Sequence, residues 1–315
     1  MSGRRVVALG GGHGLYASLS ALRHLTDRLT AVVTVADDGG SSGRLRRELG
    51  VLPPGDLRMA LSALCDDGEW GRTWRDVMQH RFASEGDLDQ HAVGNLLIVA
   101  LWELLDDPVA GLDWVARLLQ ARGRVLPMST RPLQIEADVQ APDGRTELVV
   151  GQGAVATTSG RITAVRLDPP EPPACPQAVA AVLDAEWVVL GPGSWFTSVM
   201  PHLLVPELAA ALTSTAARRC LVFNLAAPSG ETAGMTAVAH LHSLHAHAPQ
   251  LRIDAVLADP GSVDDVDALA AAADLLGARL VLRQVRVSAG SHHHDPLRLA
   301  AALRDVLDGR YGDVD

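Results

Sequence analysis

A glycine-rich turn follows the first apolar run of the chain. Val6 to Leu9 has the character of a short buried strand, Gly10 to Gly14 forms the turn, and Leu15 to His24 has the apolar spacing of a helix. Glycines leave backbone N–H groups open to a phosphate, and the N-terminus of the following helix favours an anion. This order of elements predicts an α/β fold with a phosphate-binding loop, whose candidate ligand contacts are Gly11, Gly12, His13 and Gly14.

The spacing of these glycines leaves a second interpretation open. Leu15 stands where the dinucleotide-binding fingerprint has its third glycine, so the turn does not match the usual NAD pattern. A tight turn between a strand and a helix, with no ligand, would have the same composition.

A second loop favours ligand binding. It follows the apolar run Leu29 to Val35 and is rich in small and acidic residues. An acidic residue that ends the second strand can accept hydrogen bonds from a ribose or hold a cation, so Asp37 is favoured over Asp38, although either can serve only as a turn residue. The candidate contacts in this loop are Asp37, Asp38, Gly40, Ser41 and Ser42.

Further β-type runs alternate with helical patterns along the chain. We expect strands at 187–190, 220–223 and 255–257, and helices at 95–105, 111–122, 206–217, 236–247, 263–276 and 297–307. The alternation predicts an α/β fold with a doubly wound, mainly parallel Rossmann-like sheet. Between about 124 and 173 the period becomes that of strands, which predicts an inserted antiparallel β unit. We therefore expect a single α/β nucleotide-binding domain over residues 1–315 with this insertion.

The composition indicates a globular cytoplasmic protein. Its formal net charge is −10, and its basic residues are interspersed with acidic ones, which argues against a nucleic-acid binder. No apolar run has the length of a membrane span, and no signal-peptide pattern is visible. Cys65, Cys175 and Cys220 lack a C-x-x-C pattern, as expected for reduced packing residues.

Several segments together resemble the gluconeogenesis factor family, the YvcK-like proteins. The resemblance is carried, in chain order, by the string Val33 to Arg46, the P-P-G-D-x-R turn Pro53 to Arg58, the H-R-F of His80 to Phe82, the H-x-x-G-N-L-L of His91 to Leu97, the G-P-G-S block from Gly191 to Pro206, and Asn224 with Gly230-Glu231-Thr232. Departures include His13, where the family commonly has threonine, and Ala227-Pro228 in the loop after Asn224.

The resemblance implies a regulatory protein that binds a UDP-sugar, such as UDP-N-acetylglucosamine, and supports cell shape during growth on gluconeogenic carbon sources. The gluconeogenesis factor family is itself similar, in its first loops and fold, to 2-phospho-L-lactate transferase. This similarity implies an alternative function, that of a phosphoryl-group transferase that uses Mg²⁺ or another divalent metal. A NAD oxidoreductase is disfavoured because the fingerprint is not met. Homo-oligomers and regulatory protein partners are compatible with the first role.

Other motif residues are candidates with a simpler alternative. The second glycine turn and the hydroxyls after it can bind phosphate or sugar oxygens, or form only a Pro-Gly turn with a serine cap. These candidates are Gly191, Gly193, Ser194, Thr197 and Ser198. Asn95 could contact a base or ribose or merely cap a helix, while His91 could neutralise phosphate. Among the arginines near the small-residue loops, Arg58 beside Asp56 is favoured for a bidentate phosphate contact, although arginines are more often surface charges. The resemblance adds the ligand-binding candidates Asp56, Asn224, Glu231 and Thr232.

Two histidine clusters are not assigned to a metal. Four histidines, His240, His242, His245 and His247, lie on one expected helix. Only His240 with His247, or His242 with His245, share a face, and no carboxylate or cysteine accompanies them. His292 to His294 are expected in a polar loop. No resident metal site is predicted.

Overall fold

A seven-stranded parallel sheet forms the centre of the computed structural model, which describes residues 3–141, 143–225, 230–232 and 234–312. Its strands lie in the spatial order β10 (Arg279–Leu282), β9 (Ala255–Ala258), β8 (Arg218–Val222), β7 (Trp187–Leu190), β1 (Val6–Gly10), β2 (Leu29–Val33) and β3 (Arg124–Pro127). Every residue of β1 and β7 is buried. Strands that are apolar on both faces are typical of a parallel sheet covered on both sides by helices.

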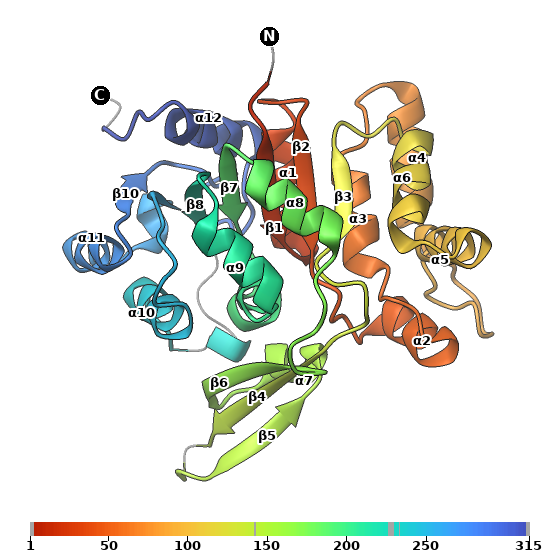
Figure 1. Cartoon of the computed structure of the whole chain (residues 1–315), viewed down its shortest axis with the longest axis horizontal. Helices are drawn as coiled ribbons and strands as arrows, with labels where there is room; N and C mark the ends of the chain where they lie inside the picture. Colours follow the sequence, from red (N-terminus) through yellow and green to blue (C-terminus); the bar gives the residue numbers. More distant parts are fainter. Residues whose placement is uncertain (1–2, 142, 226–229, 233, 313–315) are drawn as a thin grey trace.

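The helices form two layers around this sheet (Figure 1). Helices α1 (Gly12–Leu22), α3 (Gly55–Ala63) and α12 (Pro296–Leu307) pack together on one side, and α8 (Pro176–Asp184) packs against α9 (Pro206–Ser214) on the other. The remaining α-helices are α2 (Gly40–Leu49), α4 (Glu69–Gln79), α5 (Val93–Leu105), α6 (Pro108–Leu118), α7 (Gln152–Thr157), α10 (Ala237–His247) and α11 (Val266–Leu275). The short helical segments are η1 (Trp195–Val199), η2 (Met200–Leu203), η3 (Gly230–Thr232) and η4 (Pro260–Ser262).

A small antiparallel sheet projects from the carboxyl edge of the main sheet (Figure 1). It consists of β5 (Thr146–Val150), β4 (Gln134–Gln140) and β6 (Arg161–Asp168), in that spatial order. Buried and partly exposed residues alternate along β4, so one face packs against the core. Gln134 pairs with Asp168, which places the beginning and end of this antiparallel unit on neighbouring strands.

The doubly wound, mainly parallel sheet and the inserted antiparallel unit are confirmed. The expected β-rich segment 124–173 divides between the two sheets, because β3 pairs in parallel with β2 and belongs to the main one. The antiparallel sheet itself covers residues 134–168. Strand β3 has only four residues and ends in a proline, so its sequence carries a weak strand signal.

Candidate functional site

The two glycine turns of the sequence meet at the point where the sheet changes direction. Strand β1 pairs with β2 on one side and with β7 on the other. The chain proceeds from β1 toward β3 in one direction and from β7 toward β10 in the other. In open α/β sheets, ligands bind at the carboxyl ends of the strands at such a switch point. The turns Gly10 to Gly14 and Gly191 to Ser194 both lie there.

These turns pack directly against each other. A Cβ atom added to Gly14 would lie 2.1 Å from the carbonyl oxygen of Pro192, so position 14 has no room for a side chain. The Ser18 hydroxyl donates to the Gly191 carbonyl oxygen at 2.6 Å and joins α1 to the same turn. Gly12 has a φ of +54°, and a Cβ there would meet only Asp56, at 3.9 Å. The absence of a side chain at position 12 therefore leaves open space beside the turn. At position 14, the absence of a side chain allows the two turns to pack together.

The two aspartates after β2 have different surroundings. Asp37 Oδ1 accepts the Gly39 amide at 3.0 Å, and its Oδ2 lies beside Gly55, where an added Cβ would come within 2.8 Å of it. Asp38 Oδ1 instead accepts the amide of Gly153 at 3.0 Å, in the first turn of α7. Asp38 thus connects the β2 loop to the antiparallel unit, and Asp37 stays at the carboxyl edge of the main sheet.

A second carboxylate lies beneath the first glycine turn. Asp56 is partly exposed as a residue, but its Oδ2 accepts the Thr34 hydroxyl at 3.0 Å and would be only 2.5 Å from a Cβ on Gly11. Burial raises the pKa of the Asp56 carboxyl to about 6, and the charge of Asp37 adds to the rise. The Thr34 hydroxyl and the Gly12 amide act in the opposite direction. Two acidic side chains therefore lie close together at the base of the turn.

The motif residues of α2, α3 and α5 form a buried polar network. The Ser41 hydroxyl lies 3.1 Å from His91 Nδ1 and accepts from Asn95 Nδ2 at 3.0 Å. Asn95 Oδ1 in turn accepts Arg58 Nε at 2.9 Å, and Arg58 also donates to Gln79. Burial lowers the pKa of Arg58 to about 10 and also lowers that of His91. Arg58, His91 and Asn95 thus hold the three helices together behind the β2 loop.

The loop after β8 supports the second glycine turn. Asn224 donates from Nδ2 to the Gly193 carbonyl at 2.7 Å and accepts the Gly193 amide on Oδ1 at 2.8 Å. Glu231 is 5% exposed and accepts the Phe196 amide at 3.0 Å. Thr197 is buried and Thr232 is partly buried, whereas Ser194 and His13 are exposed. The structure therefore brings the later motif residues to the edge that holds Gly11 and Gly12.

One residue at this edge, Thr34, was not among the candidates from the sequence. A Cβ added to Gly11 would lie 2.3 Å from the Thr34 hydroxyl and 3.4 Å from that of Ser198, which the sequence did suggest. Thr34 lies within the V-T-V run that continues β2, where a threonine is an ordinary strand residue.

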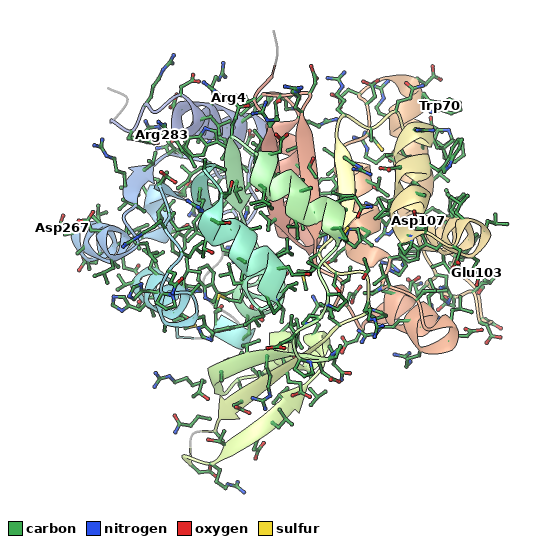
Figure 2. The ribbon with its side chains drawn as sticks, in the orientation of Figure 1. Arg4, Trp70, Glu103, Asp107, Asp267 and Arg283 are labelled. Atoms are coloured by element: carbon green, nitrogen blue, oxygen red, sulfur yellow. The ribbon has the colours of Figure 1, made fainter. Side chains whose placement is uncertain are left out.

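Two hollows lie at the opposite edge of the sheet. One, of about 460 Å³, is lined by residues that include Arg4, Trp187 and Arg218, and a second, of about 500 Å³, includes Arg28 and Arg124. In Figure 2, Arg4 marks that edge, beside the beginning of β1. We place the candidate site at the carboxyl edge because the glycine turns and the paired carboxylates lie there and ligands of such sheets bind at that edge.

The histidines of α10 have packing contacts. The His240 ring is 5.1 Å from the Trp195 ring, edge to face, and its Nδ1 lies 2.8 Å from the Thr236 carbonyl. Within the described ranges, no group of three or more His, Cys, Asp and Glu side chains could hold a metal ion. Among the helices that the structure describes, none alone is long and apolar enough to cross a membrane. The segment η1–η2 and helix α9 are long and apolar enough only when they are taken together, and a 75° bend separates them.

The paired glycine turns at the switch point of a doubly wound sheet define a Rossmann-like α/β protein. The family model described as 2-phospho-L-lactate transferase CofD matches residues 6–278, and the chain belongs to this family. A crystal structure of a UPF0052 family member from Bacillus halodurans is similar with a TM-score of 0.85 and 31% identity, over 96% of this chain and 100% of that one.

Relatives of known name support the resemblance stated above. A protein of Mycobacterium leprae named "Putative gluconeogenesis factor" is 54% identical over 310 residues, which cover 96% of this chain and 86% of the relative. The "Gluconeogenesis factor" of Listeria monocytogenes is 38% identical over 82% of this chain and 78% of its own. The similarity to the gluconeogenesis factors, and the relation to the transferase, are therefore confirmed.

Proposed function

We propose that this protein binds a UDP-linked sugar, such as UDP-N-acetylglucosamine, and acts as a cytoplasmic regulator of cell shape during growth on gluconeogenic carbon sources. The observation that carries the proposal is the pair of glycine turns that pack together between β1 and β7, with Asp37 at the end of β2. Backbone amides without neighbouring side chains bind a diphosphate, and an acidic residue after the second strand accepts from a ribose. The name gluconeogenesis factor, carried by the relatives, supports the link to growth on gluconeogenic carbon sources.

The first test is nucleotide preference. UDP-N-acetylglucosamine should raise the melting temperature more than NAD or ATP at equal concentration, because a ligand that binds only the native state stabilises it by mass action. A larger shift with NAD, or no shift with any UDP-sugar, would overturn the proposal. The proposal also includes a homo-oligomer and a regulatory protein partner. It includes no nucleic-acid ligand and no binding to a membrane.

A matched pair of glycine variants locates the site. Gly12→Val places a branched side chain in the open space beside the turn at a φ of +54°, whereas Gly309→Val has a similar φ of +74° beside Arg218, at the opposite edge. Both variants carry the backbone strain of a left-handed residue. Titration calorimetry should show that Gly12→Val loses UDP-N-acetylglucosamine binding and Gly309→Val retains it. Equal affinities would place the ligand elsewhere.

A second candidate function is phosphoryl-group transfer with a divalent metal. The observation that favours it is the proximity of the Asp37 and Asp56 carboxylates below the glycine turn, because Mg²⁺ is held by one or two carboxylates together with substrate phosphates. Such an ion would neutralise charge on a diphosphate. Phosphoryl-group transfer breaks the P–O–P bond of the diphosphate, so UDP-N-acetylglucosamine would release UMP while the sugar phosphate passes to the acceptor or to water. Steady release of UMP in the presence of Mg²⁺, lost in Asp37→Asn, would favour the transferase, and an unchanged nucleotide would favour the regulator.

A further inference from the structure

The segment that follows the second glycine turn lacks a cap of its own. It is a five-residue π-helix, η1, and its preceding residue, Ser194, makes no side-chain hydrogen bond to it. The first amides of a helix need acceptors from elsewhere. One acceptor comes from η3, where Glu231 Oε1 receives the Phe196 amide at 3.0 Å.

The Glu231 carboxylate is buried for this contact. It is 5% exposed, and its Oε2 has no hydrogen-bond partner among the described residues that meets the distance and angle limits of a good bond. Burial raises the pKa of the Glu231 carboxyl, while the amides of η1 and the hydroxyl of Thr197 lower it. A buried charge of this kind is costly unless backbone dipoles stabilise it. The amides of η1 offset part of that cost.

Glu231 also closes a chain of contacts around the candidate site. Asp38 holds the first turn of α7 through Gly153, and α7 packs against η3 and η1. The contact with η3 is close, since a Cβ added to Gly230 would lie 2.0 Å from the Ala156 carbonyl oxygen. In Figure 1, η3 is the cyan segment next to α7, at the carboxyl edge of the sheet. Asp38 therefore joins the β2 loop to α7, and Glu231 joins η3, which packs on α7, to the segment after the second glycine turn.

We propose that Glu231 is a positioning residue, which fixes the turn Gly191 to Ser194 for a nucleotide diphosphate by holding η1, and which does not itself contact the ligand. This inference rests on the nucleotide-binding function proposed above. An acidic side chain would repel a diphosphate at close range. We therefore assign Glu231 its role through the hydrogen bond with the backbone of η1. Asn224 holds the same turn from the other side, through both polar groups of Gly193.

The test compares Glu231→Ala, Glu231→Gln and the control Glu207→Ala. Glu207 on α9 likewise accepts a backbone amide, that of Ala174 at 2.7 Å, away from the turns. In titrations with UDP-N-acetylglucosamine, Glu231→Ala should bind roughly tenfold or more weakly, because the hydrogen bond that holds η1, and through it the turn, is lost. Glu231→Gln keeps an acceptor and should restore most of the affinity, and Glu207→Ala should bind like wild type.

Hydrogen exchange supplies the second measurement. Amides of residues 195–199 should exchange faster in Glu231→Ala than in wild type, with protection restored in Glu231→Gln and unchanged in Glu207→Ala. Wild-type affinity in Glu231→Ala, or failure of Glu231→Gln to restore it, would overturn the inference. If wild type itself bound no UDP-sugar, the proposed function would fail, while the exchange data would still show whether Glu231 holds η1. If Glu231→Ala did not fold, Glu231→Asp, whose shorter side chain cannot reach Phe196, would replace it under the same criteria.

Discussion

Burial is the main reason that the pKa of the Asp56 carboxyl rises from its ordinary 3.8 to about 6 in the folded protein. At pH values between these two pKa values, the folded protein binds more protons than the unfolded chain. The free energy of unfolding therefore falls as pH rises through this window. At neutral pH the charge costs up to about 3 kcal/mol, at 1.36 kcal/mol for each pKa unit. The lost stability is regained below about pH 4.

We therefore predict that Asp56→Asn unfolds at a higher denaturant concentration than wild type at pH 7, and that the difference disappears near pH 4. The amide oxygen can still accept from the Thr34 hydroxyl. Asp267→Asn is the control, because Asp267 lies exposed on α11 at the far side of the molecule (Figure 2). Equal stability of wild type and Asp56→Asn at pH 7 would contradict the cost assigned to this charge.

A second prediction at this scale concerns Asp37. Asp37→Asn keeps an acceptor for the Gly39 amide, so the fold should be unchanged, but it removes the negative charge. Affinity for UDP-N-acetylglucosamine should fall roughly tenfold to a hundredfold, as for the loss of a charged hydrogen bond. Titration calorimetry measures this, with the exposed His242→Ala on α10 as control. Unchanged affinity would contradict the ribose contact proposed for Asp37.

At the scale of elements, the contact between Asp38 and α7 determines how firmly the antiparallel unit is held. A helix of six residues is too short to be stable alone, so α7 depends on its tertiary contacts. Asp38→Ala should therefore increase hydrogen exchange at residues 151–157 without unfolding the main sheet. Asp143→Ala, at the exposed hairpin turn, should leave this exchange unchanged. Full protection of α7 in Asp38→Ala would show that its packing against η1 and η3 is sufficient.

The sequence predicted the elements with strong periodicity and missed those without it. Strands β1, β2, β7, β8 and β9 follow from their apolar runs, whereas β10 begins with an arginine and has only three apolar residues. Helix α2 begins with Gly-Ser-Ser-Gly, which is typical of a loop. The glycine turns were predicted because a turn that leaves its backbone amides open needs glycines, which are visible in the sequence. The contacts of Asn224 and Glu231 were not predicted, because they join segments that only the strand order of the whole sheet brings together.

At the scale of the whole molecule, the antiparallel unit is a removable part of the fold. Gln134 and Asp168 are paired neighbours, so a short glycine-serine linker can replace residues 135–167. We predict that the shortened protein keeps the helical and strand signal of the main sheet in circular dichroism but melts at a lower temperature, because buried residues such as Ile135 and Leu167 are lost. It should not bind UDP-N-acetylglucosamine. Retained binding would show that the unit has no part in the site.

The packing of Gly14 against Pro192 also bears on how the chain folds. The two turns are far apart in sequence, and Asp38 and Gly153 are separated by 115 residues. Contacts between distant segments form late, because the intervening chain must first be ordered. During synthesis, a chain that has not yet extended past Glu231 lacks part of the site, however well its first strands have formed. Nucleotide binding would then distinguish completed molecules from unfinished ones.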